Sequence, residues 1–176
     1  AAEQPDREAV DAWWTVFDDP QLTDLIERTG GANLDRKHAQ ARIREALSRI
    51  DQVSFRNVLD PRGDTATFVI FLLPTAEKAR AFNKVMAAEG CGAVYWHDNY
   101  WHFYEEWEHL LEGRSVLPGG YPFRSPDGQA RCRFPKDALP KTTAWLSRTL
   151  TIPVNIHMEE QIPKILNAIE KAARVL

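Results

Sequence analysis

The sequence predicts an α/β fold, with a small sheet flanked by helices and preceded by an N-terminal helical extension. From Val53 onward, short runs of β-branched and aromatic residues alternate with segments whose apolar residues recur at helical spacing. Before Val53 the apolar spacing is helical throughout. The 176 residues, 44% hydrophobic and 27% charged, have the composition of one soluble domain, or of one small domain with an extension.

The first 50 residues predict three helices. The first begins near Glu8 and ends before the Asp-Asp-Pro sequence, and Pro20 suits the first turn of a second, short helix. The stretch "TGGANLD" predicts a break, after which Asp35 is the expected N-cap of a longer helix. We therefore divide the chain into a helical extension (1–34) and an α/β domain (35–176).

The α/β domain is predicted to contain one central strand, "TATFVIFLL" (65–73), because this run is apolar on both faces. Residues 114–136 are rich in glycine and proline and predict a long loop, a feature that is often functional or mobile. Pro163 places the start of the terminal helix near Glu160 or kinks that helix. The other expected elements are a strand and turn (53–64), a helix closed by Gly90 (74–90), a strand (91–96), two helices (103–113 and 138–147) and a strand (149–154).

Charge and motifs exclude several classes of function. The net charge of −3 provides no bulk field for nucleic acid or an anionic membrane, and the longest apolar run, Phe68 to Leu73, is too short to span a bilayer. There is no phosphate-cradling P-loop and no nucleophile elbow. Cys91 and Cys132 read as core thiols in a reducing compartment, and no secretory signal is visible, so we expect a soluble cytoplasmic protein.

The stretch "VYWHDNYWHFYEEWEHLLEG" (94–113) holds the strongest candidate site. It contains three tryptophans, three histidines and three tyrosines, many of which could simply pack a core. Polar side chains nevertheless crowd the junction between a predicted strand and a predicted helix, a place where ligands collect in α/β proteins. Aromatic faces with histidine and amide groups suit a polar ring such as a sugar. The candidate residues are His97, Asp98, Asn99, Trp101 and His102.

Two other groups of residues are weaker candidates. His102, Glu106 and His109 would share one helix face and could converge on a metal, but such spacings arise often by chance, and we predict no metal site. Arg131 and Arg133, with Lys136, form a small basic stretch that could meet a phosphate or carboxylate, although a solvated loop face explains them as well.

Residues 35–176 resemble the C-terminal small domain of the DegT/DnrJ/StrS family of sugar aminotransferases. The similarity runs through "RKHAQARIREALSRIDQV", then "GDTATFVIFLLPTAEKARAFNKVMAAEGCGAVYW", and ends with "LPKTTAWLSRTLTIPVNIHMEEQIPKILNAIEKAA". His97 and His102 match a family motif H-[F/Y]-x-x-x-H, with one extra residue before His97. The resemblance implies that both histidines contact a keto-sugar or nucleotide-sugar substrate, supported by Asp98, Asn99 and Trp101.

The same resemblance implies pyridoxal 5′-phosphate as the cofactor of the complete enzyme. In the family, the Schiff-base lysine and most cofactor contacts lie in a large N-terminal domain, and none of the seven lysines here stands at that lysine's position. We therefore expect no cofactor and no activity in this chain alone, with a large-domain polypeptide or a homodimer completing the site. The alternative is a stand-alone or engineered binding or interaction module whose sugar pocket is vestigial.

Residues 9–34 resemble a different family. The pattern "WW-x-x-F-x-D-P-x-L-x-x-L-I" is similar to the opening of mature outer-membrane efflux factors of the TolC type. From this segment we predict only an amphipathic helical hairpin and no channel function. A junction between two unrelated pieces is typical of a recombined or designed protein.

Overall fold

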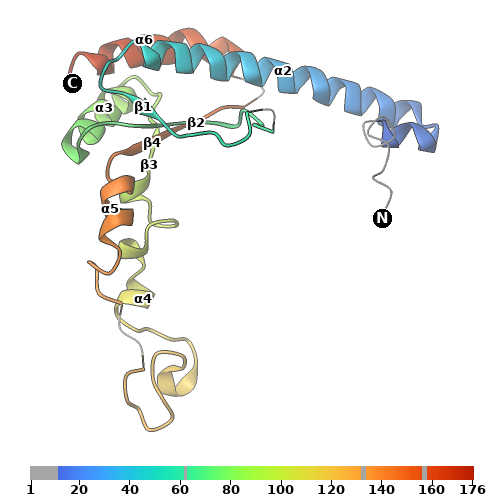
Figure 1. Ribbon diagram of the computed structural model, residues 1–176. Helices are drawn as coiled ribbons and strands as arrows, with labels where there is room; N and C mark the ends of the chain where they lie inside the picture. The colour runs from blue at the N-terminus through green and yellow to red at the C-terminus, as the bar shows by residue number, and fades with distance from the viewer. Residues whose placement is uncertain (1–11, 62, 132–133, 156–157) are drawn as a thin grey trace, which may run out of the picture.

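The computed structural model describes residues 12–61, 63–131, 134–155 and 158–176. It is a mixed helix-and-sheet body with two projections, as Figure 1 shows. The sheet has four strands in the order β1-β2-β4-β3, and every neighbouring pair is antiparallel. The mixed class and the central position predicted for the second strand are confirmed. The strands are β1 (Ser54–Phe55), β2 (Phe68–Leu72), β3 (Val94–Tyr95) and β4 (Thr149–Pro153).

The two faces of the sheet differ in burial. Val69 lies opposite Ile152 and Phe71 opposite Leu150 in the β2–β4 register, and all four side chains are buried in the core. Since side chains alternate along a strand, Phe68 and Thr151 belong to the other face. Phe68 is half exposed there, whereas Thr151 is buried. The sheet therefore has a core face and a second face, here called the outer face.

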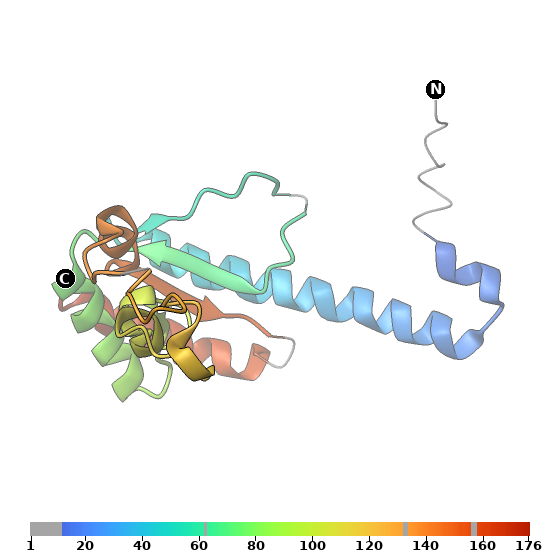
Figure 2. The same cartoon turned by 90° about the horizontal axis from the view of Figure 1, so that it is seen from below.

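Three helices cover the core face. They are α2 (Pro20–Ser48), α3 (Ala76–Ala88) and α6 (Ile162–Ala173), and each contributes buried side chains to the same cluster as the strands. The rings of Phe71 and Phe82 meet edge to face at 5.7 Å and join α3 to β2. Figure 2 shows the sheet from below, the side opposite α2 and α6. One hydrophobic core thus fixes the positions of all three helices.

The ends of α3 and α6 follow their sequence signals. The Thr75 side chain accepts a hydrogen bond from the backbone N–H of Lys78 at 3.3 Å and caps α3. Gly90, with φ of +70°, closes that helix as predicted, because this left-handed conformation costs glycine little. Pro163 lies in the first turn of α6, which begins at Ile162 after a 3-10 turn at Glu159–Gln161. Pro163 therefore marks the start of the terminal helix and does not kink it.

The N-terminal prediction was wrong in one respect. A 3-10 helix, η1 (Trp13–Phe17), precedes a single helix of 29 residues, α2, which continues through Gly30 and Gly31 without a break. Its N-cap is Asp19, whose carboxylate accepts from the backbone of Gln21 and Leu22. Each glycine costs a helix only about 1 kcal/mol relative to alanine, so it weakens α2 without breaking it. The predicted division at residue 34 thus falls inside α2, and the predicted start at Glu8 lies outside the described residues.

The helix predicted over residues 103–113 is split in two. A 3-10 turn, η3 (Tyr104–Glu106), and the one-turn helix α4 (Glu108–Leu111) are separated by Trp107, whose φ and ψ of −87° and 79° are not helical. The described parts of the predicted loop, residues 114–131 and 134–136, are irregular apart from a 3-10 turn at Pro118–Gly120, and α5 (Pro140–Leu146) leads back to the sheet. The Tyr104 hydroxyl joins η3 to the chain between the loop and α5. It donates a hydrogen bond to the Lys136 carbonyl and accepts one from the Leu139 N–H at 3.0 Å.

Candidate functional site

The candidate residues follow β3 directly, in the 3-10 turn η2 (Trp96–Asp98) and the irregular segment after it. Ligands collect at the carboxyl ends of parallel strands in open sheets, and that rule supported the prediction. Here β3 is a two-residue strand in an antiparallel sheet, so the rule does not apply.

Asn99 organises the first of two polar groups. Its side-chain oxygen accepts a hydrogen bond from the Trp101 backbone N–H at 3.1 Å and lies 2.8 Å from Nδ1 of His102. A backbone N–H can only donate, so the atom that it meets is the amide oxygen. Because that oxygen can only accept, the His102 Nδ1 carries a hydrogen. The neutral ring then has Nε2 as its acceptor.

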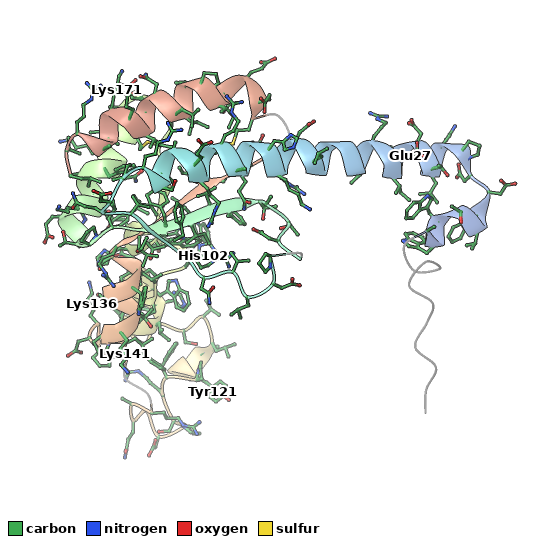
Figure 3. The ribbon with its side chains drawn as sticks, turned by 45° about the horizontal axis from the view of Figure 1, so that its top comes forward. Glu27, His102, Tyr121, Lys136, Lys141 and Lys171 are labelled. Atoms are coloured by element: carbon green, nitrogen blue, oxygen red, sulfur yellow. The ribbon has the colours of Figure 1, made fainter. Side chains whose placement is uncertain are left out.

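This first group is tied to the outer face of the sheet. The His102 ring packs edge-on against Trp96, with 5.2 Å between the ring centres. The Trp96 indole N–H donates to the Thr151 hydroxyl at 2.7 Å, and Thr151 is only 1% exposed. Figure 3 shows His102 on the side of the sheet away from α2 and α6. The central strand β4 therefore positions the exposed His102 through the half-buried Trp96.

The second polar group brings in a residue from another element. Nη2 of Arg80, on α3, lies 3.4 Å from a carboxylate oxygen of Asp98 and 3.5 Å from Nδ1 of His97. The same carboxylate oxygen is 3.2 Å from that Nδ1. A carboxylate only accepts, so the His97–Asp98 contact requires a hydrogen on Nδ1, and Arg80 then donates to Asp98 rather than to the ring.

Tyr95 lies beneath this second group. The Arg80 guanidinium lies over the Tyr95 ring, 5.7 Å from the ring centre. The Tyr95 hydroxyl donates a hydrogen bond to the Ser147 carbonyl at 2.8 Å. Burial raises the pKa of the Tyr95 hydroxyl, because desolvation disfavours the phenolate. The pKa of Arg80 is also raised, chiefly by Tyr95 and then by Asp98. Arg80 thus stays a cation at this surface.

The structure places the five predicted residues at one junction, where their side chains differ in exposure. His97 is held between Phe103 and Tyr95, at 4.9 and 5.9 Å, and its side chain is 24% exposed. Trp101 is 79% exposed, and His102 is exposed as well. A nearby cavity of about 300 Å³ is lined by four glutamates, Tyr100, Leu111 and Lys136. The exposed side chains of Trp101 and His102 give this junction an open surface.

The two weaker sites gain no support. Within the described ranges, no three His, Cys, Asp or Glu side chains are grouped so that they could hold a metal, His102, Glu106 and His109 included. Arg131 is exposed, and Arg133 lies outside the described residues. The basic stretch therefore remains a sequence pattern without a described geometry.

The described contacts of the junction include no lysine that could hold pyridoxal phosphate. That cofactor needs a lysine held at its aldehyde carbon. Among the described hydrogen bonds and ion pairs, Lys78 binds Gln52 and the Leu176 carbonyl, and Lys171 binds Glu89. In that same set of contacts, no lysine reaches the segment from His97 to His102.

Sequence reasoning missed Arg80, Trp96 and Thr151 as parts of this site. A threonine inside the apolar run "TLTIPV" was the one available signal, because a buried hydroxyl needs a partner. Arg80 had no such signal, since it lies 17 residues before His97 and meets it only in the fold.

No protein-family model matches this chain. Both family resemblances therefore remain predictions. In the part of the chain that the structure describes, no helix has both the length and the apolar character needed to cross a membrane.

The two histidines should respond differently to truncation. His97→Ala removes a ring packed between two aromatic side chains and should lower the melting temperature by several degrees. His102→Ala removes an exposed ring and should change it by about 1–2 degrees. Thermal unfolding followed by circular dichroism measures both. Equal losses would contradict the different burial of the two rings.

Proposed function

We propose that the chain is the substrate-side small domain of a pyridoxal phosphate-dependent sugar aminotransferase, working with a large domain that carries the cofactor. The proposal is supported chiefly by the order of elements, which agrees with what the family resemblance implies. In the structure α2 is followed by the short strand β1, then by β2, α3, the turn at Gly90, β3, the long loop, α5, β4 and α6. The His102–Asn99 pair lies on the outer face, which α2, α3 and α6 leave free for a second domain.

The contacts suggest a role for each group toward a sugar. The exposed indole of Trp101 can cover a C–H face of the ring, and Nε2 of His102 can accept a hydrogen bond from a hydroxyl. Asn99 positions His102 and does not itself need to touch the ligand. Arg80 provides the positive charge for a carboxylate or phosphate on the substrate.

A stand-alone binding module is the second candidate function. It is favoured by the exposure of Tyr100 and Trp101, whose rings meet edge to face at 6.1 Å. Such a pair can hold a sugar ring without any catalytic group. In this case binding would be complete in the isolated chain.

The first experiment asks whether a cofactor site exists in this chain. The purified protein is mixed with pyridoxal 5′-phosphate, reduced with borohydride and analysed by intact mass. We expect no stoichiometric adduct. A single adduct on one lysine would contradict the proposal, because the chain would then hold its own cofactor.

The second experiment tests the sugar surface by ligand-observed NMR with a nucleotide-linked keto-sugar. The ligand signal should fall severalfold in the Trp101→Ala and His102→Ala variants. Lys141→Ala, an exposed change on α5, is the matched control and should leave it unchanged. Binding that survives both site substitutions would place the ligand elsewhere and contradict both candidate functions.

A further inference from the structure

The first half of α2 forms an arm that the body does not cover. Figures 1 and 2 show it running beyond the sheet, with η1 folded back beside it. Among the described side chains of α2, Ala39 is the first that is buried. The arm, residues 13–35, instead exposes large apolar side chains to solvent, namely Trp13, Val16, Phe17, Leu25 and Leu34.

A helical segment that packs against nothing gains little free energy to stabilise it. Isolated helices of about 12–15 residues are marginal in water, and Gly30 and Gly31 each cost about 1 kcal/mol more relative to alanine. The local support comes from η1, where Trp13 meets Trp14 and Phe17 edge to face at 6.3 and 6.0 Å. A second molecule that covered the exposed apolar side chains would supply the missing stabilisation.

Charge along α2 indicates what that molecule is. Residues 18–27 carry four acidic side chains and no basic one, at Asp18, Asp19, Asp24 and Glu27. Residues 36–44 carry four basic side chains and no acidic one, at Arg36, Lys37, Arg42 and Arg44. Some have weak surface partners, such as Arg28 for Asp24 and Glu159 for Arg42. The two blocks lie on either side of Gly30 and Gly31.

We propose that the arm binds a second copy of this chain, with the two α2 helices antiparallel. In that arrangement the acidic block of each copy lies beside the basic block of the other, and the two-fold axis passes near the glycines between the blocks. The contact is then made twice by symmetry. Two parallel helices in register would put like charges together, so the charge pattern selects the antiparallel arrangement.

The length of the paired segment is consistent with a specific interface. The two charge blocks with the turns between them span residues 18–44, which falls within the roughly 20–30 residues that each partner contributes to an interface of standard size. The apolar side chains would supply the affinity and the charge blocks the orientation. This inference does not depend on the proposed enzymatic role.

Charge reversal tests the proposal. Sedimentation of the full chain should show a dimer at micromolar concentration. Asp24→Lys with Glu27→Lys, and separately Lys37→Glu with Arg42→Glu, should each weaken the dimer tenfold or more (about 1.4 kcal/mol per tenfold). Mixing the two variants should restore association as a heterodimer, because the reversed blocks are again complementary.

Three controls keep the outcome clear. Asp137→Lys with Glu160→Lys makes the same charge change at exposed positions outside α2 and should leave the dimer intact. Arg42→Ala removes the contact with Glu159 without reversing a charge. Circular dichroism checks that each variant keeps its helix. A monomeric wild-type protein, or a dimer indifferent to both reversals, would overturn the proposal.

Discussion

Replacing Phe82 with alanine is expected to lower the free energy of unfolding by about 3–5 kcal/mol. The Phe82 side chain is fully buried on α3 and meets the ring of Phe71 on β2 edge to face. Its removal leaves a cavity in the single core that joins α2, α3 and α6 to the sheet. Urea denaturation followed by circular dichroism would measure the loss.

Phe68→Ala is the matched control for this prediction. Phe68 is also a phenylalanine near the sheet, but it is 50% exposed on the outer face, so its truncation should cost only about 1 kcal/mol. The two variants remove the same atoms and differ mainly in burial. Equal losses would show that the outer face is covered in solution.

Removing the Phe82 side chain should also affect the candidate site, because Phe82 lies on α3. Arg80 and Asn83 lie on α3 beside Phe82, and the Asn83 side-chain oxygen accepts from the Ala93 N–H at 2.8 Å, just before β3. Helix α3 thereby aligns both the start of β3 and the cation beside Asp98. Loosening α3 should disturb the Arg80–His97–Asp98 group before it disturbs the Asn99–His102 pair.

The elements that the sequence predicted correctly are those whose local signals agree with their packing. Strand β2 combines β-branched and aromatic residues with burial on the core face, and α3 has a capping threonine before it and a glycine after it. The prediction failed where a local signal conflicted with a larger one. At Gly30 the breaking tendency of glycine was outweighed by a long helix, and at Trp107 a helical pattern was interrupted by a non-helical backbone.

The candidate site was predictable only in part, for a physical reason. The cluster from His97 to His102 is local in sequence, so its composition could be recognised. The partners that orient it, Arg80 and Thr151, come from other elements and meet it only through the antiparallel pairing and the docking of α3. The pairing direction that invalidated the parallel-sheet rule is likewise a property of the whole sheet.

Thr151→Val is expected to destabilise the protein by about 1–3 kcal/mol, although valine has nearly the same shape. The Thr151 hydroxyl accepts the Trp96 indole N–H at 2.7 Å, and its side chain is 1% exposed. Valine would leave that N–H without its hydrogen-bond partner, at a position from which water is largely excluded. Thr151→Ser keeps the hydroxyl and removes one methyl, so it should cost about 0.8 kcal/mol.

Thr149→Val is the control that distinguishes a change at the candidate site from a general loss of stability. Thr149 lies on the same strand and face, and its hydroxyl donates to the Trp145 carbonyl at 2.8 Å, so valine again removes one hydrogen bond. Only Thr151 reaches Trp96, which packs against His102. Thr151→Val should therefore shift the NMR signals of the Trp96 indole and the His102 ring, whereas Thr149→Val should not. If both variants left those signals in place, β4 would not be what positions His102, and the link between the sheet and the candidate sugar surface would be lost.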